Sequence, residues 1–120
     1  MKKILYIDDD KNACMLAKVY MEKYHFYFIF THDTENARAE LRKNNFDLII
    51  CDIGLPKEDG MEFYHWLHSE DNYKNIPFLF VSAHAMGFDK LLVEHKDIFI
   101  QKPIFFPDLI NRINKLLLDN

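Results

Sequence analysis

Apolar and polar positions alternate in blocks along the chain. Short, nearly continuous apolar runs are separated by longer segments in which apolar residues recur every three or four positions. Continuous runs of this length are typical of parallel strands that are covered on both faces. We therefore expect five strands, at residues 4–7, 27–30, 48–51, 78–81 and 98–100.

The segments that follow these runs carry a helical period. Clear stripes are predicted on a first helix at Ala13, Leu16, Ala17, Tyr20 and Tyr24, and on a last helix at Phe106, Leu109, Ile110, Ile113, Leu116 and Leu117. Three less regular helices are expected around Ala37 and Leu41, around Met61, Tyr64 and Leu67, and around Phe88, Leu91, Leu92 and His95. Strict alternation of strands and helices implies right-handed crossovers, and so a flavodoxin-like (βα)5 fold: a doubly wound five-stranded parallel sheet in the order 2-1-3-4-5.

Composition limits the number of domains, the classes of ligand and the cellular location that we expect. The length of 120 residues with 49% hydrophobic content suits one domain over residues 1–120, and a net charge of −4 gives no basic surface for nucleic acid. The apolar stretch before Asp8 is too short for a signal peptide or a membrane span. Cys14 and Cys51 lie far apart without metal or redox spacing, so we expect reduced thiols in a cytoplasmic protein. Cys51 precedes Asp52 on an alternating strand and should point into the core.

Acidic residues follow two of the predicted strands. Asp8, Asp9 and Asp10 follow the first, and Asp52 follows the third. Strand carboxyl ends at the switch point of a doubly wound sheet lie close together, so these carboxylates should meet. Such a cluster needs a cation or a raised pKa, and hard oxygen ligands select Mg²⁺ or Mn²⁺. The alternative that Asp8 to Asp10 merely cap the first helix stays open at this point.

A hydroxyl and a cation follow the last two strands. Ser82 follows the fourth apolar run, and Lys102 follows the fifth, directly before Pro103. Either residue alone is an ordinary turn or surface residue. Together they bring a hydroxyl donor and a positive charge to the acidic edge, which is what a phosphorylated carboxylate would need.

Four segments, in order, resemble the response-regulator receiver domains of two-component signalling. They are ILYIDDD at 4–10, DLIICDIGLPKEDG at 47–60, PFLFVSA at 77–83 and IFIQKP at 98–103. The resemblance covers essentially the whole chain.

The resemblance implies a metal-assisted phosphoacceptor site. Asp52 would accept the phosphoryl group, and Asp9 would bind Mg²⁺ directly beside it. Asp8 would hold the metal through water, and the carbonyl of Gly54 would complete the protein ligands. Asp10 would lie at the edge of the site and serve the first helix.

The resemblance also implies a switch. Lys102 would stabilise the phosphoryl charge, Ser82 would move toward the phosphoryl oxygens, and Phe99 would fill the space that Ser82 leaves. The bond from Lys102 to Pro103 is expected to be cis. His84 is a side chain that would influence hydrolysis of the phosphoryl group, or else point to solvent.

The function implied is that of a signalling phosphoacceptor in a phosphorelay. Its phosphoryl donor would be a histidine kinase or a histidine phosphotransfer protein, and its phosphorylation would switch binding to a downstream protein partner. Such a protein is not a conventional enzyme, although it assists its own phosphorylation and dephosphorylation. A pseudo-receiver that is never phosphorylated is the alternative. The sequence does not specify the kinase, the target, the oligomeric state, the pathway or whether an output domain follows residue 120.

Overall fold

The computed structural model describes residues 1–83 and 98–118. The helix expected around Phe88 to His95, and the predicted role of His84, lie outside the described residues. None of the helices in the described ranges is long and apolar enough to cross a bilayer.

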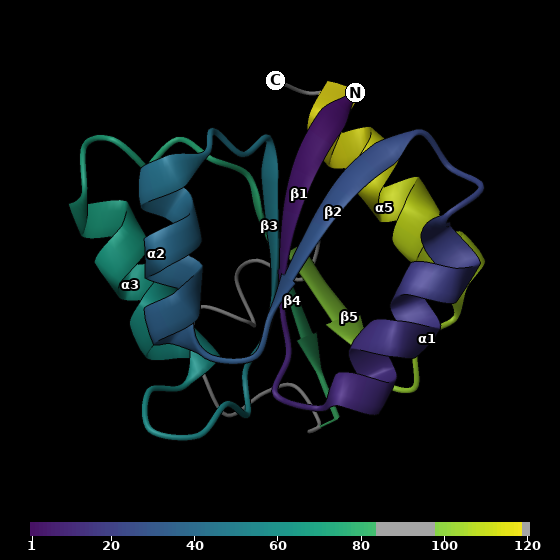
Figure 1. Cartoon of the computed structure of the whole chain (residues 1–120), viewed down its shortest axis with the longest axis horizontal. Helices are drawn as coiled ribbons and strands as arrows, with labels where there is room; N and C mark the ends of the chain where they lie inside the picture. The colour runs from purple at the N-terminus through teal and green to yellow at the C-terminus, as the bar shows by residue number, and fades with distance from the viewer. Residues whose placement is uncertain (84–97, 119–120) are drawn as a thin grey trace.

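A five-stranded parallel sheet forms the middle of the molecule (Figure 1). Its order is β2-β1-β3-β4-β5, as predicted from the alternating pattern. The strands are β1 (Lys2–Ile7), β2 (Phe26–Thr31), β3 (Leu48–Asp52), β4 (Phe78–Ser82) and β5 (Phe99–Gln101). The last strand begins one residue later than predicted, and the others extend the predicted cores by one or two residues at one or both ends.

Helices cover both faces of the sheet. They are α1 (Lys11–Met21), α2 (Thr34–Lys43), α3 (Gly60–Ser69) and α5 (Phe106–Leu118). Helices α2 and α3 lie on one face, and α1 and α5 lie on the other (Figure 1). Asp10, Asp33 and Asp59 cap the first three helices by accepting hydrogen bonds from first-turn amides. These caps fix where each helix begins, directly after the carboxyl end of the strand or loop that precedes it.

Alternation along the strands divides the core in two. Leu5, Ile7, Ile49 and Cys51 pack under α2 and α3, whereas their neighbours along the same strands pack under α1 and α5. Cys51 is fully buried, which confirms its predicted place in the core. Burial on both faces explains why the middle stretches of β1, β3 and β4 are apolar at consecutive positions rather than at every second one.

The buried stripe predicted for the first helix is partly wrong. Ala17 is buried, but Leu16 and Tyr20 are 52% and 51% exposed, and α1 ends before the last predicted position. The residues that face the sheet are Cys14, Ala17 and Met21. Tyr20 lies to the side, where its ring stacks on that of Phe106 in α5 with centroids 4.7 Å apart. A neighbouring helix, rather than the sheet, therefore contacts part of the apolar surface of α1.

Candidate phosphoacceptor site

The acidic residues leave the carboxyl ends of β1 and β3, at the lower edge of the sheet in Figure 1. The hydrogen bonds between neighbouring strands continue one residue past the ends of β1 and β3. The amide of Asp8 donates to the carbonyl of Thr31 at 3.0 Å, and the amide of Ile53 donates to the carbonyl of Val81 at 3.2 Å. Asp8 and Asp52 therefore stand on backbone that neighbouring strands hold in place. This support explains how residues 44 positions apart in the sequence meet at one point.

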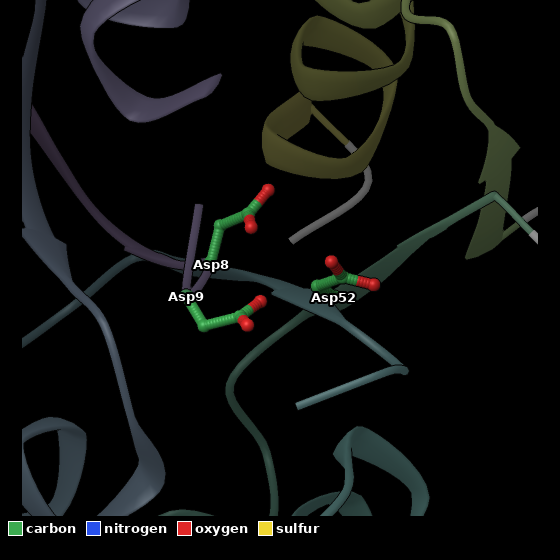
Figure 2. Close-up of side chains that lie close together, drawn as sticks. All are labelled: Asp8, Asp9 and Asp52. Atoms are coloured by element: carbon green, nitrogen blue, oxygen red, sulfur yellow. The ribbon is translucent and has the colours of Figure 1, made fainter. Parts of the chain in front are cut away.

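Three carboxylates converge there (Figure 2). One oxygen from each of Asp8, Asp9 and Asp52 lies within 4.8 Å of the others. The side chain of Asp8 is 1% exposed and that of Asp52 is 12% exposed, whereas Asp9 is exposed. The carboxylate of Asp9 extends toward Asp52 from the loop after β1 (Figure 2). The predicted meeting of the two strand ends is confirmed.

Lys102 brings a single positive charge into this cluster. Its Nζ donates to Asp8 Oδ2 at 2.8 Å and to Asp52 Oδ2 at 3.0 Å. The backbone amide of Lys102 donates to the carbonyl of Ser82 at 2.7 Å, which fixes the start of the loop after β5. The peptide bond between Lys102 and Pro103 is cis, as predicted. Within residues 1–83 and 98–118, three carboxylates thus meet one ammonium group.

Burial and charge act in opposite directions at this ion pair. Burial raises the pKa of Asp8, and this effect exceeds the lowering by Lys102 and by the amide of Asp10. Burial alone would lower the pKa of Lys102, but its hydrogen bonds to the two carboxylates outweigh burial and raise that pKa. The lysine therefore stays charged, while burial disfavours the charged form of the carboxylate beside it.

The acidic triplet after β1 combines both interpretations left open by the sequence. Asp10 caps α1, with its carboxylate accepting from the amides of Asn12 and Ala13 at 2.9 and 3.2 Å. Asp8 and Asp9 belong to the carboxylate cluster instead. Both oxygens of Asp8 accept hydrogen bonds from the protein, one from Lys102 and one from the amide of Asp10.

The loop from β3 to α3 starts and ends against Asp52. The amide of Gly54 donates to Asp52 Oδ1 at 3.1 Å. At the other end, a Cβ on Gly60 would lie 2.4 Å from the carbonyl oxygen of Asp52, so a residue without a side chain is required there. This close approach lets α3 begin directly beside the acidic residue.

Ser82 and Phe99 lie next to this edge on adjacent strands. Ser82 is 1% exposed and Phe99 is 4% exposed. The parallel register pairs Ser82 with Gln101, two residues beyond Phe99. The structure thus brings the serine to the same edge as the acids and leaves the phenylalanine in the core beneath.

Two features of this edge are not evident from the sequence. His32 Nδ1 donates to the carbonyl of Asp8 at 3.0 Å, so the end of β2 holds the start of the acidic loop. Arg38 forms an ion pair with Glu58, which links α2 to the loop after β3. In the sequence, Arg38 is only a charged residue close to the buried positions Ala37 and Leu41 of α2. That pattern does not indicate which acidic residue it pairs with.

The family model for the response regulator receiver domain matches residues 4–114. The chain belongs to this family. The receiver domain is 30% identical over 120 residues to the polar-differentiation response regulator DivK of Brucella anthropi, covering 98% of each chain. It is also 30% identical to the sensory transduction protein BceR of Halalkalibacterium halodurans, covering 98% of this chain but 50% of that protein.

Solved structures support the same assignment. Response regulator TrrA of Thermotoga maritima, in complex with Mg²⁺ and BeF, superposes with a TM-score of 0.85 at 26% identity and covers 98% of this chain and 100% of that chain. The receiver domain of Francisella response regulator 1452 also gives 0.85 at 26% identity, with 99% and 98% coverage. The chain is a receiver domain of the two-component type with a flavodoxin-like fold, and members of this family act as signalling phosphoacceptors.

Proposed function

We propose that Asp52 accepts a phosphoryl group from a phosphohistidine of a histidine kinase or a histidine phosphotransfer protein. The observation that carries this proposal is the position of Lys102, which bridges Asp8 and Asp52 within a cluster of three carboxylates. Asp52 is the partly exposed member at the end of a central strand, so an incoming phosphoryl group can reach it. The side chain of Asp8, by contrast, is 1% exposed.

The donor set fits Mg²⁺. Carboxylate oxygens from three residues within 4.8 Å of one another are hard ligands, and among the described residues the single lysine at the cluster leaves their charge unbalanced. Asp9 and Asp52 would bind the ion directly together with the Gly54 carbonyl, and Asp8, whose side chain is the most deeply buried of the three, would act through water. When bound there, Mg²⁺ would neutralise charge on the carboxylates and on the incoming phosphoryl oxygens.

The chemistry follows from these positions. A carboxylate oxygen of Asp52 attacks phosphorus in line, the phosphorus–nitrogen bond of the donor breaks, and its electron pair returns to the imidazole, which takes a proton from solvent. Lys102 stabilises the negative charge that collects on the phosphoryl oxygens. The product is an acyl phosphate, and attack by water on its phosphorus restores Asp52. The domain thereby assists its own phosphorylation and dephosphorylation.

The signal would pass through Ser82 and Phe99. The hydroxyl of Ser82 would donate to a phosphoryl oxygen on Asp52, and Phe99 on the next strand would repack into the space that the hydroxyl leaves. A downstream protein would bind the altered surface, as the family implies. A cytoplasmic location belongs to this proposal, supported by two buried free thiols, Cys14 and Cys51.

The test is phosphorylation by a small donor. Incubation of the parent protein with phosphoramidate and Mg²⁺ should add one phosphoryl group, detected by intact mass. Asp52→Asn should add none while keeping its circular dichroism spectrum, because the amide matches the carboxylate in shape but is not a nucleophile. Equal labelling of Asp52→Asn would refute the assignment, and a parent that never labels would indicate a pseudo-receiver.

A further inference from the structure

The loop between β3 and α3 carries Gly54, the proposed carbonyl ligand, and its base is firmly held. The amides of Leu55 and Gly60 both donate to the carbonyl of Ile53, at 3.0 and 2.8 Å. The side chain of Leu55 is buried in the core under α2 and α3. These contacts fix both ends of the loop but not its outer part.

The outer part of the loop is a strained turn. Lys57 has a φ of 66°, a left-handed conformation that a residue with a Cβ adopts at some cost. The amide of Glu58 donates to the carbonyl of Pro56 across this turn at 2.8 Å. Pro56 and Lys57 are both exposed. A strained and exposed turn persists when contacts outside it hold it in place.

Glu58 supplies that contact through Arg38. Arg38 Nη2 donates to Glu58 Oε2 at 2.8 Å, and Nη1 lies 2.7 Å from Oε1. Thr34, in the first turn of α2, also helps to lower the pKa of this carboxylate. Two nitrogens opposite two oxygens define one orientation, which a lysine could not reproduce.

Arg38 is itself fixed by aromatic rings of α3. Its guanidinium carbon lies 4.4 Å from the centroid of the Trp66 ring and 5.2 Å from that of Phe63. The Phe63 ring is buried, and its centroid is 5.7 Å from that of Trp66. Stacking of this kind holds a guanidinium in one plane. Arg38 therefore joins α2, α3 and the loop tip.

From this geometry we infer that Arg38 is a positioning residue for the metal site. By holding Glu58, it fixes the outer part of the loop of residues 53–59, whose base carries Gly54 beside Asp52. The inference rests on the proposed Mg²⁺ site. Residues that orient a metal ligand typically change metal affinity about 10- to 100-fold, and Arg38 acts further out, so its loss should weaken Mg²⁺ binding about fivefold.

The test uses Arg38→Met, which keeps an unbranched stem against Trp66 and removes the charge. Lys74→Met is the matched control, since it removes a cation from an exposed ion pair with Asp71 on another loop. The Mg²⁺ dissociation constant is measured from the amide resonance of Gly54, and the phosphorylation rate is measured against Mg²⁺ concentration. Unfolding without metal is recorded for each protein.

Arg38→Met should bind Mg²⁺ about fivefold more weakly than parent and control, yet reach the parental rate at saturating Mg²⁺. Adding Glu58→Gln to Arg38→Met should cause no further loss, because both changes break one interaction. The Mg²⁺ affinity of Arg38→Lys should lie between that of the parent and that of Arg38→Met. If Arg38→Met does not fold, Arg38→Lys tests the inference in its place.

Parental Mg²⁺ affinity in a folded Arg38→Met or Arg38→Lys, with lower resistance to unfolding alone, would overturn the inference and leave Arg38 a structural residue. Additive losses in the double variant would also overturn it. A parent protein whose Gly54 resonance ignores Mg²⁺ would instead refute the proposed metal site.

Discussion

Two cations join distant elements at the carboxyl edge of the sheet, and their surroundings differ. Lys102 pairs with Asp8 and Asp52 while Asp9 lies beside them, so negative charge is in excess among the residues that the structure describes. Arg38 pairs with Glu58, and within the described part of the chain this pair is one cation with one carboxylate. The contrast separates two uses of an ion pair: an unbalanced cluster attracts a further cation and a reacting group, whereas a balanced pair holds the backbone in place.

The pKa values of the carboxylates show the same contrast. At Glu58 the hydrogen bond from Arg38 lowers the pKa and outweighs burial. At Asp8 burial raises the pKa and outweighs Lys102. Perturbed pKa values are typical of functional sites. At Asp8 the perturbation disfavours the charged carboxylate, and it occurs where three carboxylates converge.

The largest expected effect comes from removing the cation of the unbalanced cluster. Lys102→Met should slow phosphorylation by phosphoramidate about 100-fold, because a positioned charge that stabilises a transferring group contributes on that order. Rates are measured by intact mass at saturating Mg²⁺. Lys74→Met, which disrupts the exposed pair with Asp71, should keep the parental rate. A Lys102→Met rate within a factor of about two of the parent would remove the lysine from the reaction.

Supplying a second cation should stabilise the same cluster. At a Mg²⁺ concentration about 100 times the dissociation constant, the free energy of unfolding should rise by about 2.7 kcal/mol. Asp9→Asn should lose most of this gain and, without metal, be at least as stable as the parent, because carboxylate repulsion is relieved. Denaturant titrations with Mg²⁺ and with chelator provide the measurement. A full Mg²⁺ gain in Asp9→Asn would place the ion elsewhere.

A smaller effect distinguishes the two carboxylates by pH in metal-free protein. The folded-state pKa of Asp8 is raised above 3.8, so its contribution to stability falls as pH rises from 3.8 through the raised value. The folded-state pKa of Glu58 is lowered below 4.5, so its contribution is present above 4.5 and lost as pH falls through the lowered value.

Between about pH 3 and 6, the unfolding free energies of variants at these two positions should therefore change in opposite directions relative to the parent. Relative to the parent, Asp8→Asn should gain stability as pH rises, whereas Glu58→Gln should lose it. Slopes of the same sign for the two variants would show that the two ion pairs do not differ as described.

Sequence reasoning predicted the sheet and the acidic site well for a physical reason. Strands covered on both faces are apolar throughout, and parallel topology brings their carboxyl ends together. Asp8, Asp52 and Lys102 each stand at or directly beyond such an end, so strand order brings all three to the same edge of the sheet. Family resemblance then implied the roles of the individual residues.

The errors and omissions arise where side chains contact side chains. Leu16 and Tyr20 fit the period of α1, but periodicity does not tell whether the sheet or α5 covers them. The pairing of Arg38 with Glu58 depends on how α2 and α3 pack across the loop, and nothing in either local sequence specifies it. Contacts between elements that are not adjacent strands require the three-dimensional structure.

The most direct test of the central claim is to locate the phosphorylated residue chemically. Borohydride reduces an aspartyl phosphate to homoserine, which survives proteolysis and peptide sequencing by mass spectrometry. After phosphorylation with phosphoramidate and Mg²⁺, homoserine should appear at position 52, and omission of either reagent should abolish it. Homoserine at position 8 or 9, or none in a protein that gains phosphoryl mass, would contradict the assignment of Asp52 as the phosphoacceptor.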